Sequence, residues 1–146
     1  MEHPIEIAAR LEAAYEALAV NDVSLFLSAF APNARWSMQG NVTSLPFAGN
    51  RSGHAAIREM IRLIYVEFKM RDFFIDDIII GEHSAAIRWS AMATSKATGQ
   101  QFALNVFDHI VLQKGLIVSL TQFFDTAAVA ATAGRIALVT ADTSVG

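Results

Sequence analysis

Residues 71–124 carry no helical repeat of apolar side chains, and this absence constrains the fold more than any other feature. They contain instead extended apolar runs, separated by turn-forming sequences at 81–84, around Thr98–Gly99 and at Lys114–Gly115. Consecutive apolar runs joined by such short connections are typical of antiparallel strands. We therefore predict a four-stranded meander at Phe73–Ile80, Ala85–Thr94, Gln101–Leu112 and Ile117–Phe124.

Three amphipathic helices are expected in the first half of the chain. Between residues 5 and 20 apolar side chains recur three or four positions apart, and Pro4 suits the first turn of such a helix. A short second helix is expected at Val23–Phe30, with Pro32 ending it. Ser52 can cap the third helix, whose apolar stripe comprises Ile57, Met60, Ile61, Ile64, Tyr65 and Phe68.

The segment between the second and third helices predicts one strand and an irregular loop. Residues alternate in polarity at Ala34–Gln39, which places Trp36 and Met38 on the apolar face of a half-buried strand. Residues 40–53 are rich in Gly, Asn, Ser and Pro, with one short extended piece near Val42–Leu45. We expect this loop to form a flexible rim.

The composition is that of a folded domain held together by packing. The 146 residues are 53% hydrophobic and 17% charged, which suits one domain and excludes disorder. Cysteine is absent and the net charge is −3, so neither a disulfide framework nor a basic nucleic-acid surface is expected. The N-terminus lacks signal-peptide features, and no apolar run approaches the roughly 20 residues that span a bilayer. We expect a soluble, cytoplasmic protein with no membrane partner.

Helices followed by a meander predict the α+β class, with the helices on one face of a strongly curved sheet. The run 101–112 is apolar on both faces, because Leu104, Val106 and Ile110 alternate with Phe107 and Val111. One face can pack against the helices, and the other needs a second cover. We therefore expect a homodimer that forms through the sheet.

Several local signatures resemble one known superfamily. They are FAPNARW at 30–36, RSGHAAI at 51–57, Asp108 ahead of Gly115–Val118, and Phe124–Asp125 at the end of the last strand. With the order of helices and strands, these residues resemble the nuclear transport factor two-like superfamily, in its SnoaL-like and ketosteroid isomerase-like branch. The same fold hosts many unrelated activities, so the resemblance specifies the fold better than the chemistry.

This resemblance implies the architecture in more detail. A cone-shaped, mostly antiparallel sheet would pack against three N-terminal helices in a single domain at 1–146, with a core at about 4–130 and a tail at 131–146. A largely apolar cavity would lie between the concave sheet and the helices and would open near the rim at 40–53.

The resemblance also implies candidate catalytic residues. Ketosteroid isomerase uses an Asp base with an oxyanion hole made by a Tyr and a protonated Asp. The oxyanion pair corresponds to Tyr15 and Asp108, whereas the base corresponds to Met38, whose thioether cannot accept a proton. The acid/base position of SnoaL itself falls near Gln122. His109 could supply a base only if it reached the cavity, although strand alternation points it away from Asp108.

The resemblance and the apolar faces of the helices and strands also predict which residues line the cavity. His54, in the first turn of the third helix, is expected at the rim. The four histidines are scattered without acidic partners at ligand spacing, so we expect neither a metal site nor a cofactor. The expected pocket residues are Trp36, Met38, Phe68, Leu104, Val106, Gln122 and Phe124.

These features leave several functions open. The first is an enzyme of isomerase, cyclase or dehydratase type that acts on a small cyclic or carbonyl-bearing metabolite. The second is a non-catalytic ligand-binding or structural homodimer, and the third is a module like the small subunit of aromatic-ring dioxygenases. An epoxide hydrolase pairs an Arg with an Asp on one strand, so that chemistry would require Arg88 to point inward beside Asp108.

Overall fold

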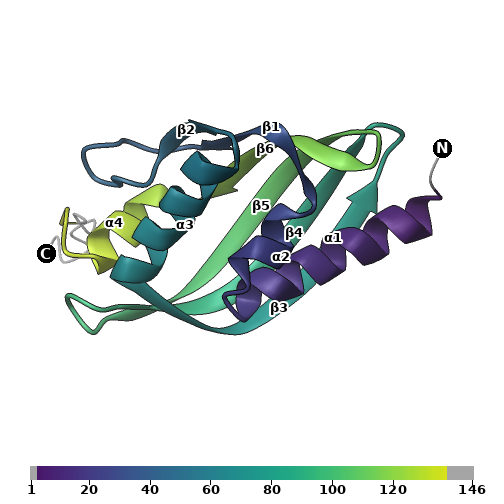
Figure 1. Cartoon of the computed structure of the whole chain (residues 1–146). Helices are drawn as coiled ribbons and strands as arrows, with labels where there is room; N and C mark the ends of the chain where they lie inside the picture. The colour runs from purple at the N-terminus through teal and green to yellow at the C-terminus, as the bar shows by residue number, and fades with distance from the viewer. Residues whose placement is uncertain (1–2, 138–146) are drawn as a thin grey trace, which may run out of the picture.

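A curved six-stranded sheet organises the molecule in the computed structural model, which describes residues 3–137. The strand order is β2-β1-β6-β5-β4-β3, and every pairing is antiparallel except β1 with β6. Helices α1 and α3 lie over the same face of the sheet (Figure 1). The elements are α1 (Pro4–Ala19), α2 (Val23–Leu27), β1 (Phe30–Met38), β2 (Gly49–Ser52), α3 (His54–Glu67), β3 (Phe68–Ile80), β4 (Ser84–Ser95), β5 (Gln101–Gln113), β6 (Leu116–Phe124) and α4 (Thr126–Thr132).

The predicted α+β class and the four-stranded meander are confirmed, and the first helix agrees closely with α1. Pro4 occupies the first turn of α1, and the His3 side chain accepts a hydrogen bond from the Ile5 N–H at 3.2 Å. Asp22 caps α2 through a bond from the Leu25 N–H. Both caps satisfy backbone donors that have no partner inside the helix.

The predicted cap and end of the third helix are wrong. Ser52 belongs to β2, where it pairs with Arg35, and Gly53 precedes the helix with φ +85° and no side-chain hydrogen bond. At the other end Phe68 has an extended backbone and pairs with Ser95 of β4. Pairing in the sheet therefore overrides the helical pattern at both boundaries, although the apolar stripe on α3 is retained.

The strand between the second and third helices is longer than predicted. β1 begins at Phe30, so Pro32 lies inside the strand and not beyond the end of a helix. β2 pairs only with Arg35–Met38, which leaves Pro32 on an edge where a missing N–H is tolerated. β2 itself was not predicted. The extended piece expected at 42–45 is a turn, in which the Leu45 N–H bonds to the Asn41 carbonyl.

Alternation along β5 separates the two faces of the sheet as the sequence predicts. Leu104, Val106, Asp108 and Ile110 are buried, while His109 is exposed on the other face. Asp108 pairs with Ile87 of β4 on one side and with Gln122 of β6 on the other. The only carboxylate among the buried residues of the described chain thus sits in the middle of the sheet.

Two local features lie at opposite ends of the layer between helices and sheet. The register of β3 shifts between Arg71 and Phe74, where Asp72 adopts φ +56°. At the other end, α4 follows Asp125, whose side chain caps it, so the predicted short helix ahead of Gly134 is present. Of the predicted tail at 131–146, residues 138–146 lie outside the described residues.

Candidate functional site

A cavity of about 140 Å³ lies between the concave face of the sheet and the helices. The end of α1, the inner side of α3 and the first half of β3 form one wall, and strands β1, β4, β5 and β6 form the other. Val129 of α4 adds to the lining. Most lining side chains are apolar or aromatic, including Met38, Met60, Met70, Phe47, Phe68, Phe73, Phe102 and Phe124.

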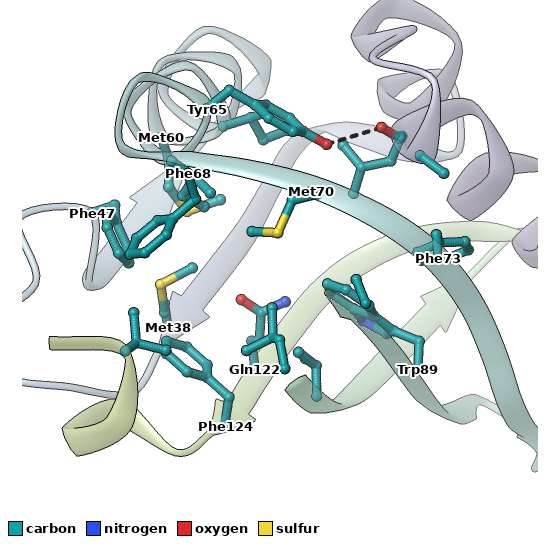
Figure 2. A pocket seen from close by; sticks show the side chains of 18 of the residues that line it. Met38, Phe47, Met60, Tyr65, Phe68, Met70, Phe73, Trp89, Gln122 and Phe124 are labelled. Atoms are coloured by element: carbon teal, nitrogen blue, oxygen red, sulfur yellow. Dashed lines mark hydrogen bonds between the residues drawn. The ribbon is translucent and has the colours of Figure 1, made fainter. Parts of the chain in front are cut away.

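Gln122 supplies the only side-chain amide among the lining residues that the structure describes. Strand β6 positions it opposite both Met38 of β1 and Asp108 of β5. Figure 2 shows the amide at the base of the cavity, between Met38 and Trp89, with Met70 across from it. The residue is only 6% exposed, so a ligand that meets this amide does so away from bulk water.

A buried hydrogen-bonded cluster centred on Asp108 lies behind this wall. Asp108 and Tyr15 are both fully buried. The Tyr15 hydroxyl donates to Asp108 Oδ2 at 2.5 Å, and Trp89 Nε1 donates to the same oxygen at 3.0 Å. Trp89 also lines the cavity, whereas Tyr15 and Asp108 do not. Asp108 therefore does not face the cavity itself and is connected to it by Trp89, which bonds to the acid and lines the cavity.

Burial raises the pKa of Asp108 from 3.8 to about 6, because a carboxylate loses its hydration inside the protein. Hydrogen bonds from Tyr15 and Trp89 and the interaction with Gln122 oppose this rise. Burial and the neighbouring carboxylate raise the pKa of Tyr15 well above 10.0. Tyr15 thus stays a neutral donor, while Asp108 gains or loses its proton near pH 6.

Two buried polar atoms of this region have no hydrogen-bond partner among the described residues. They are Asp108 Oδ1 and Nε1 of Trp36, which itself lines the cavity. Leaving such atoms unpaired is costly inside a protein, so Trp36 Nε1 is a natural contact for a polar group that enters the cavity, whereas Asp108 Oδ1 lies behind the cavity wall. The Asp108 carboxyl therefore has one saturated oxygen and one that is available.

The structure gathers most of the predicted pocket residues around the cavity. The lining includes Trp36, Met38, Phe68, Leu104, Val106, Gln122 and Phe124. Sequence reasoning missed Trp89 and Tyr65, although both carried a signal. Trp89 shares the buried face of β4 with Ile87 and Ala91, and Tyr65 belongs to the apolar stripe of α3.

Three positions do not fulfil their predicted roles. His109 is exposed on the outer face, because it neighbours the inward-facing Asp108 in a regular strand. His54 is half-buried outside the lining, with Nε2 3.0 Å from the Phe30 carbonyl oxygen. Arg88 is exposed on β4, so the arginine–carboxylate pair of epoxide hydrolases does not form.

The predicted opening at 40–53 is also wrong. From that segment only Phe47 lines the cavity, and it is buried. The exposed lining residues are Ala19, Arg71 and Asp72, where the end of α1 approaches the irregular part of β3. Arg71 and Asp72 form an ion pair at 2.7 Å. The cavity thus opens at this junction, because the 41–48 turns pack inward and seal the other side.

Neither a metal site nor a membrane-spanning helix is found among the described residues. The described part of the chain contains no group of three or more His, Asp or Glu residues that could hold a metal ion. None of the helices within residues 3–137 is both long and apolar enough to cross a membrane.

Comparisons with solved structures found the same fold in many proteins. An NTF2-like protein from Burkholderia thailandensis is 25% identical, with a TM-score of 0.76 over 90% of this chain and 98% of its own. A putative isomerase from Rhodopseudomonas palustris is 23% identical, with a TM-score of 0.73 over 93% and 99%. TerC, crystallised with polyporic acid, is 18% identical, with a TM-score of 0.80 over 88% and 98%.

Sequence comparisons specify the family. A search of curated proteins gave no match. The model of the SnoaL-like domain matches residues 11–120, which include α1 from Leu11 onward, α2, α3, Tyr15 and Asp108, and most of the cavity wall. The chain therefore belongs to the SnoaL-like domain family, within the NTF2-like fold.

Proposed function

We propose that this protein binds a small, largely apolar ring compound that carries one carbonyl or hydroxyl oxygen, and catalyses proton transfer next to that oxygen. The reaction would be of the isomerase, cyclase or dehydratase type. The observation that carries the proposal is the apolar cavity whose one amide, Gln122, is backed by the buried Asp108 cluster.

The size and chemistry of the cavity support a ring-sized ligand. A cavity of roughly 150 Å³ lined by apolar side chains is large enough for benzene, and this one is about 140 Å³. Aromatic rings and three methionine side chains suit an apolar ring, because thioethers adapt to its shape and favour contact with aromatic edges. SnoaL-like domains bind small molecules, which agrees with this use of the cavity.

The cluster supports stabilisation of charge on an oxygen. When a proton leaves a carbon next to a carbonyl, the C–H electron pair moves into the C–C bond and the carbonyl electrons move onto oxygen. An N–H of Gln122 can donate to that oxygen, while Asp108, its partner on β5, would hold the other end of the amide by a hydrogen bond. Since Met38 cannot accept the proton, we infer that a water held by Gln122 takes it and returns it to another carbon.

A second candidate is non-catalytic binding by the same cavity. Two features favour it. The thioether of Met38 lies at the wall where a base would be needed, and the Tyr15 hydroxyl already donates its hydrogen bond to Asp108 Oδ2. Both candidates share the ligand class and differ only in turnover.

We also propose that the protein forms a homodimer through the outer face of the sheet. Phe107 and Phe123 are 43% and 46% exposed and pair directly between β5 and β6. Two copies of this apolar face can cover one another. A large partner chain, as in aromatic-ring dioxygenases, is the alternative cover.

Hydrogen exchange of cyclohex-2-enone in D₂O tests the catalytic proposal. We expect the protein to accelerate deuteration next to the carbonyl, and Gln122→Met to abolish most of this acceleration while the enone still binds. Gln113→Met, which changes an exposed amide at the end of β5, is the matched control and keeps the activity. Asp77→Asn, which changes an exposed carboxylate on β3, also keeps it. Binding without accelerated exchange would favour the non-catalytic candidate, and no binding of ring compounds would refute both.

A further inference from the structure

We infer that Gln122 is the specificity-determining residue of the cavity and that the proton on Asp108 decides which end of its amide faces the ligand. With Asp108 ionised, the amide N–H₂ turns to the carboxylate and the amide oxygen faces the ligand. With Asp108 protonated, the amide oxygen accepts from Asp108 and the N–H₂ faces the ligand. The inference rests on the proposed function and deepens it.

The asymmetric bonding of Asp108 carries the first step. Oδ2 already accepts two hydrogen bonds, from Tyr15 at 2.5 Å and Trp89 at 3.0 Å. Oδ1 is buried and has no partner among the described residues. A proton that binds the carboxyl therefore resides on Oδ1, because Oδ2 is occupied by two donors.

The position of Gln122 carries the second step. It pairs with Asp108 across β5 and β6, both side chains are buried, and the Gln122 side chain also lines the cavity. One end of the amide donates and the other accepts. Whichever end turns toward Asp108, the opposite chemistry is presented to the ligand.

The surroundings of Asp108 allow it to act alone in this exchange. Tyr15 of α1 is the titratable group that bonds to it, and its raised pKa keeps it neutral throughout the relevant range. On β4 the Trp89 indole donates to the carboxyl, and on β6 its strand partner is Gln122; neither group titrates. The pKa of about 6 for Asp108 places the change within an accessible pH range.

The consequence is a switch in ligand preference with pH. Below pH 6 the cavity presents a donor and favours an oxygen that only accepts, such as a carbonyl. Above pH 6 it presents an acceptor and favours a hydroxyl that donates well. A hydroxyl and a carbonyl on the same ring are thus distinguished by one amide.

Three ring compounds of similar size test this inference. Cyclohex-2-enone only accepts, phenol donates strongly and accepts weakly, and benzene does neither. Dissociation constants are measured by NMR titration between pH 5 and 7.5, where phenol stays neutral. We expect the enone-to-phenol ratio of dissociation constants to rise about tenfold over this range, since one hydrogen bond is lost and one gained. Benzene binding should not change.

Matched variants separate the roles of the two residues. Asn in place of Asp108 presents an N–H₂ to Gln122, as the protonated acid would. Asp108→Asn should therefore keep the enone preference at every pH, and Gln122→Met should bind all three rings without preference. His109→Gln, on the outer face, should retain the switch, which excludes a contribution of that histidine.

The outcomes distinguish this inference from the proposed function. The inference would be overturned if the enone-to-phenol ratio of dissociation constants did not change with pH in the unmodified protein. It would also be overturned if that pH dependence persisted in Asp108→Asn. Binding of benzene would in both cases still support the apolar cavity. Failure of all three rings to bind would overturn the proposed function itself. If Asp108→Asn does not fold, the ¹⁵N shift of the Gln122 amide in the unmodified protein decides. It should change with a midpoint near pH 6, and a constant shift refutes the switch.

Discussion

Asp108 and His109 are consecutive residues of β5, yet they lie in opposite environments. Asp108 faces the helices, is fully buried and has its pKa raised to about 6. His109 faces outward and is exposed on the sheet surface that also carries Phe107. The comparison shows that the chemistry of this strand depends on which face a residue occupies, because burial changes both the energy and the proton affinity of a side chain.

The largest expected difference between the two faces is in stability. Ile110 is fully buried two residues after Asp108. Ile110→Ala should lower the free energy of unfolding by about 2–5 kcal/mol, because it leaves a cavity in the core. His109→Ala on the exposed face should change it by less than about 0.5 kcal/mol. Urea unfolding measures both, and equal losses would contradict the assignment of faces.

The pH dependence of stability should report on the buried acid. A folded pKa raised from 3.8 to about 6 means that the native state binds the proton more tightly. The resulting stability is fully present below pH 3.8 and is lost as pH rises through 6, a decrease of roughly 3 kcal/mol. Asp108→Asn should remove this decrease, whereas Asp77→Asn should retain it. Unfolding curves between pH 3.5 and 7.5 provide the measurement.

Removing a tyrosine hydroxyl should have a smaller effect on stability, and this effect should vary with pH only where the hydroxyl donates to the titrating Asp108. Tyr15→Phe deletes the donor to Asp108 Oδ2 and should cost about 1–3 kcal/mol at pH 7, where the acid is ionised. It should also raise the pKa of Asp108 further, since that hydrogen bond lowers it. Tyr65→Phe, which deletes a 3.0 Å bond to the Leu18 carbonyl, is the control. Its cost should not vary between pH 5 and 7.5.

The smallest change in monomer stability is expected on the outer face. Phe107→Ser should lower the free energy of unfolding of the monomer by about 1 kcal/mol, since the residue is 43% exposed and pairs with Phe123. If two copies pack through this face, sedimentation should show a shift from dimer to monomer. Leu25→Ser, at an exposed apolar residue of α2, should leave the oligomeric state unchanged. A Phe107→Ser protein that is still dimeric would place the contact elsewhere.

Local pattern was a good guide wherever one face of an element is buried. The stripe of α3 predicted its core side, and the alternation of β5 predicted that Asp108 and His109 lie on opposite faces. The inward direction of Asp108 was implied only by the family resemblance. Boundaries were predicted less well. Ser52 and Phe68 have the right chemistry for the helix, but their backbones pair with distant strands, which local sequence does not reveal.

The sequence predicted most residues of the candidate site, but not the contacts among them or the position of the cavity mouth. The apolar walls follow from alternation, so Trp36, Met38 and Gln122 were within reach of the sequence. The link from Trp89 to Asp108 depends on β4–β5 register, which brings together residues 19 positions apart. The location of the mouth depends on how the turns at 41–48 pack, and a loop rich in Gly and Asn does not specify that.

By itself the sequence determined the class of fold, the order of its elements and the face on which each apolar side chain lies, because these follow from periodicities of two and 3.6 residues. Tertiary structure decided the rest. It placed Tyr15 against Asp108 across 93 positions of chain, set both behind the cavity wall and left Gln122 between acid and cavity. Hydrogen bonds and desolvation act through space, so the proton affinity of Asp108 exists only after the sheet and α1 have packed together.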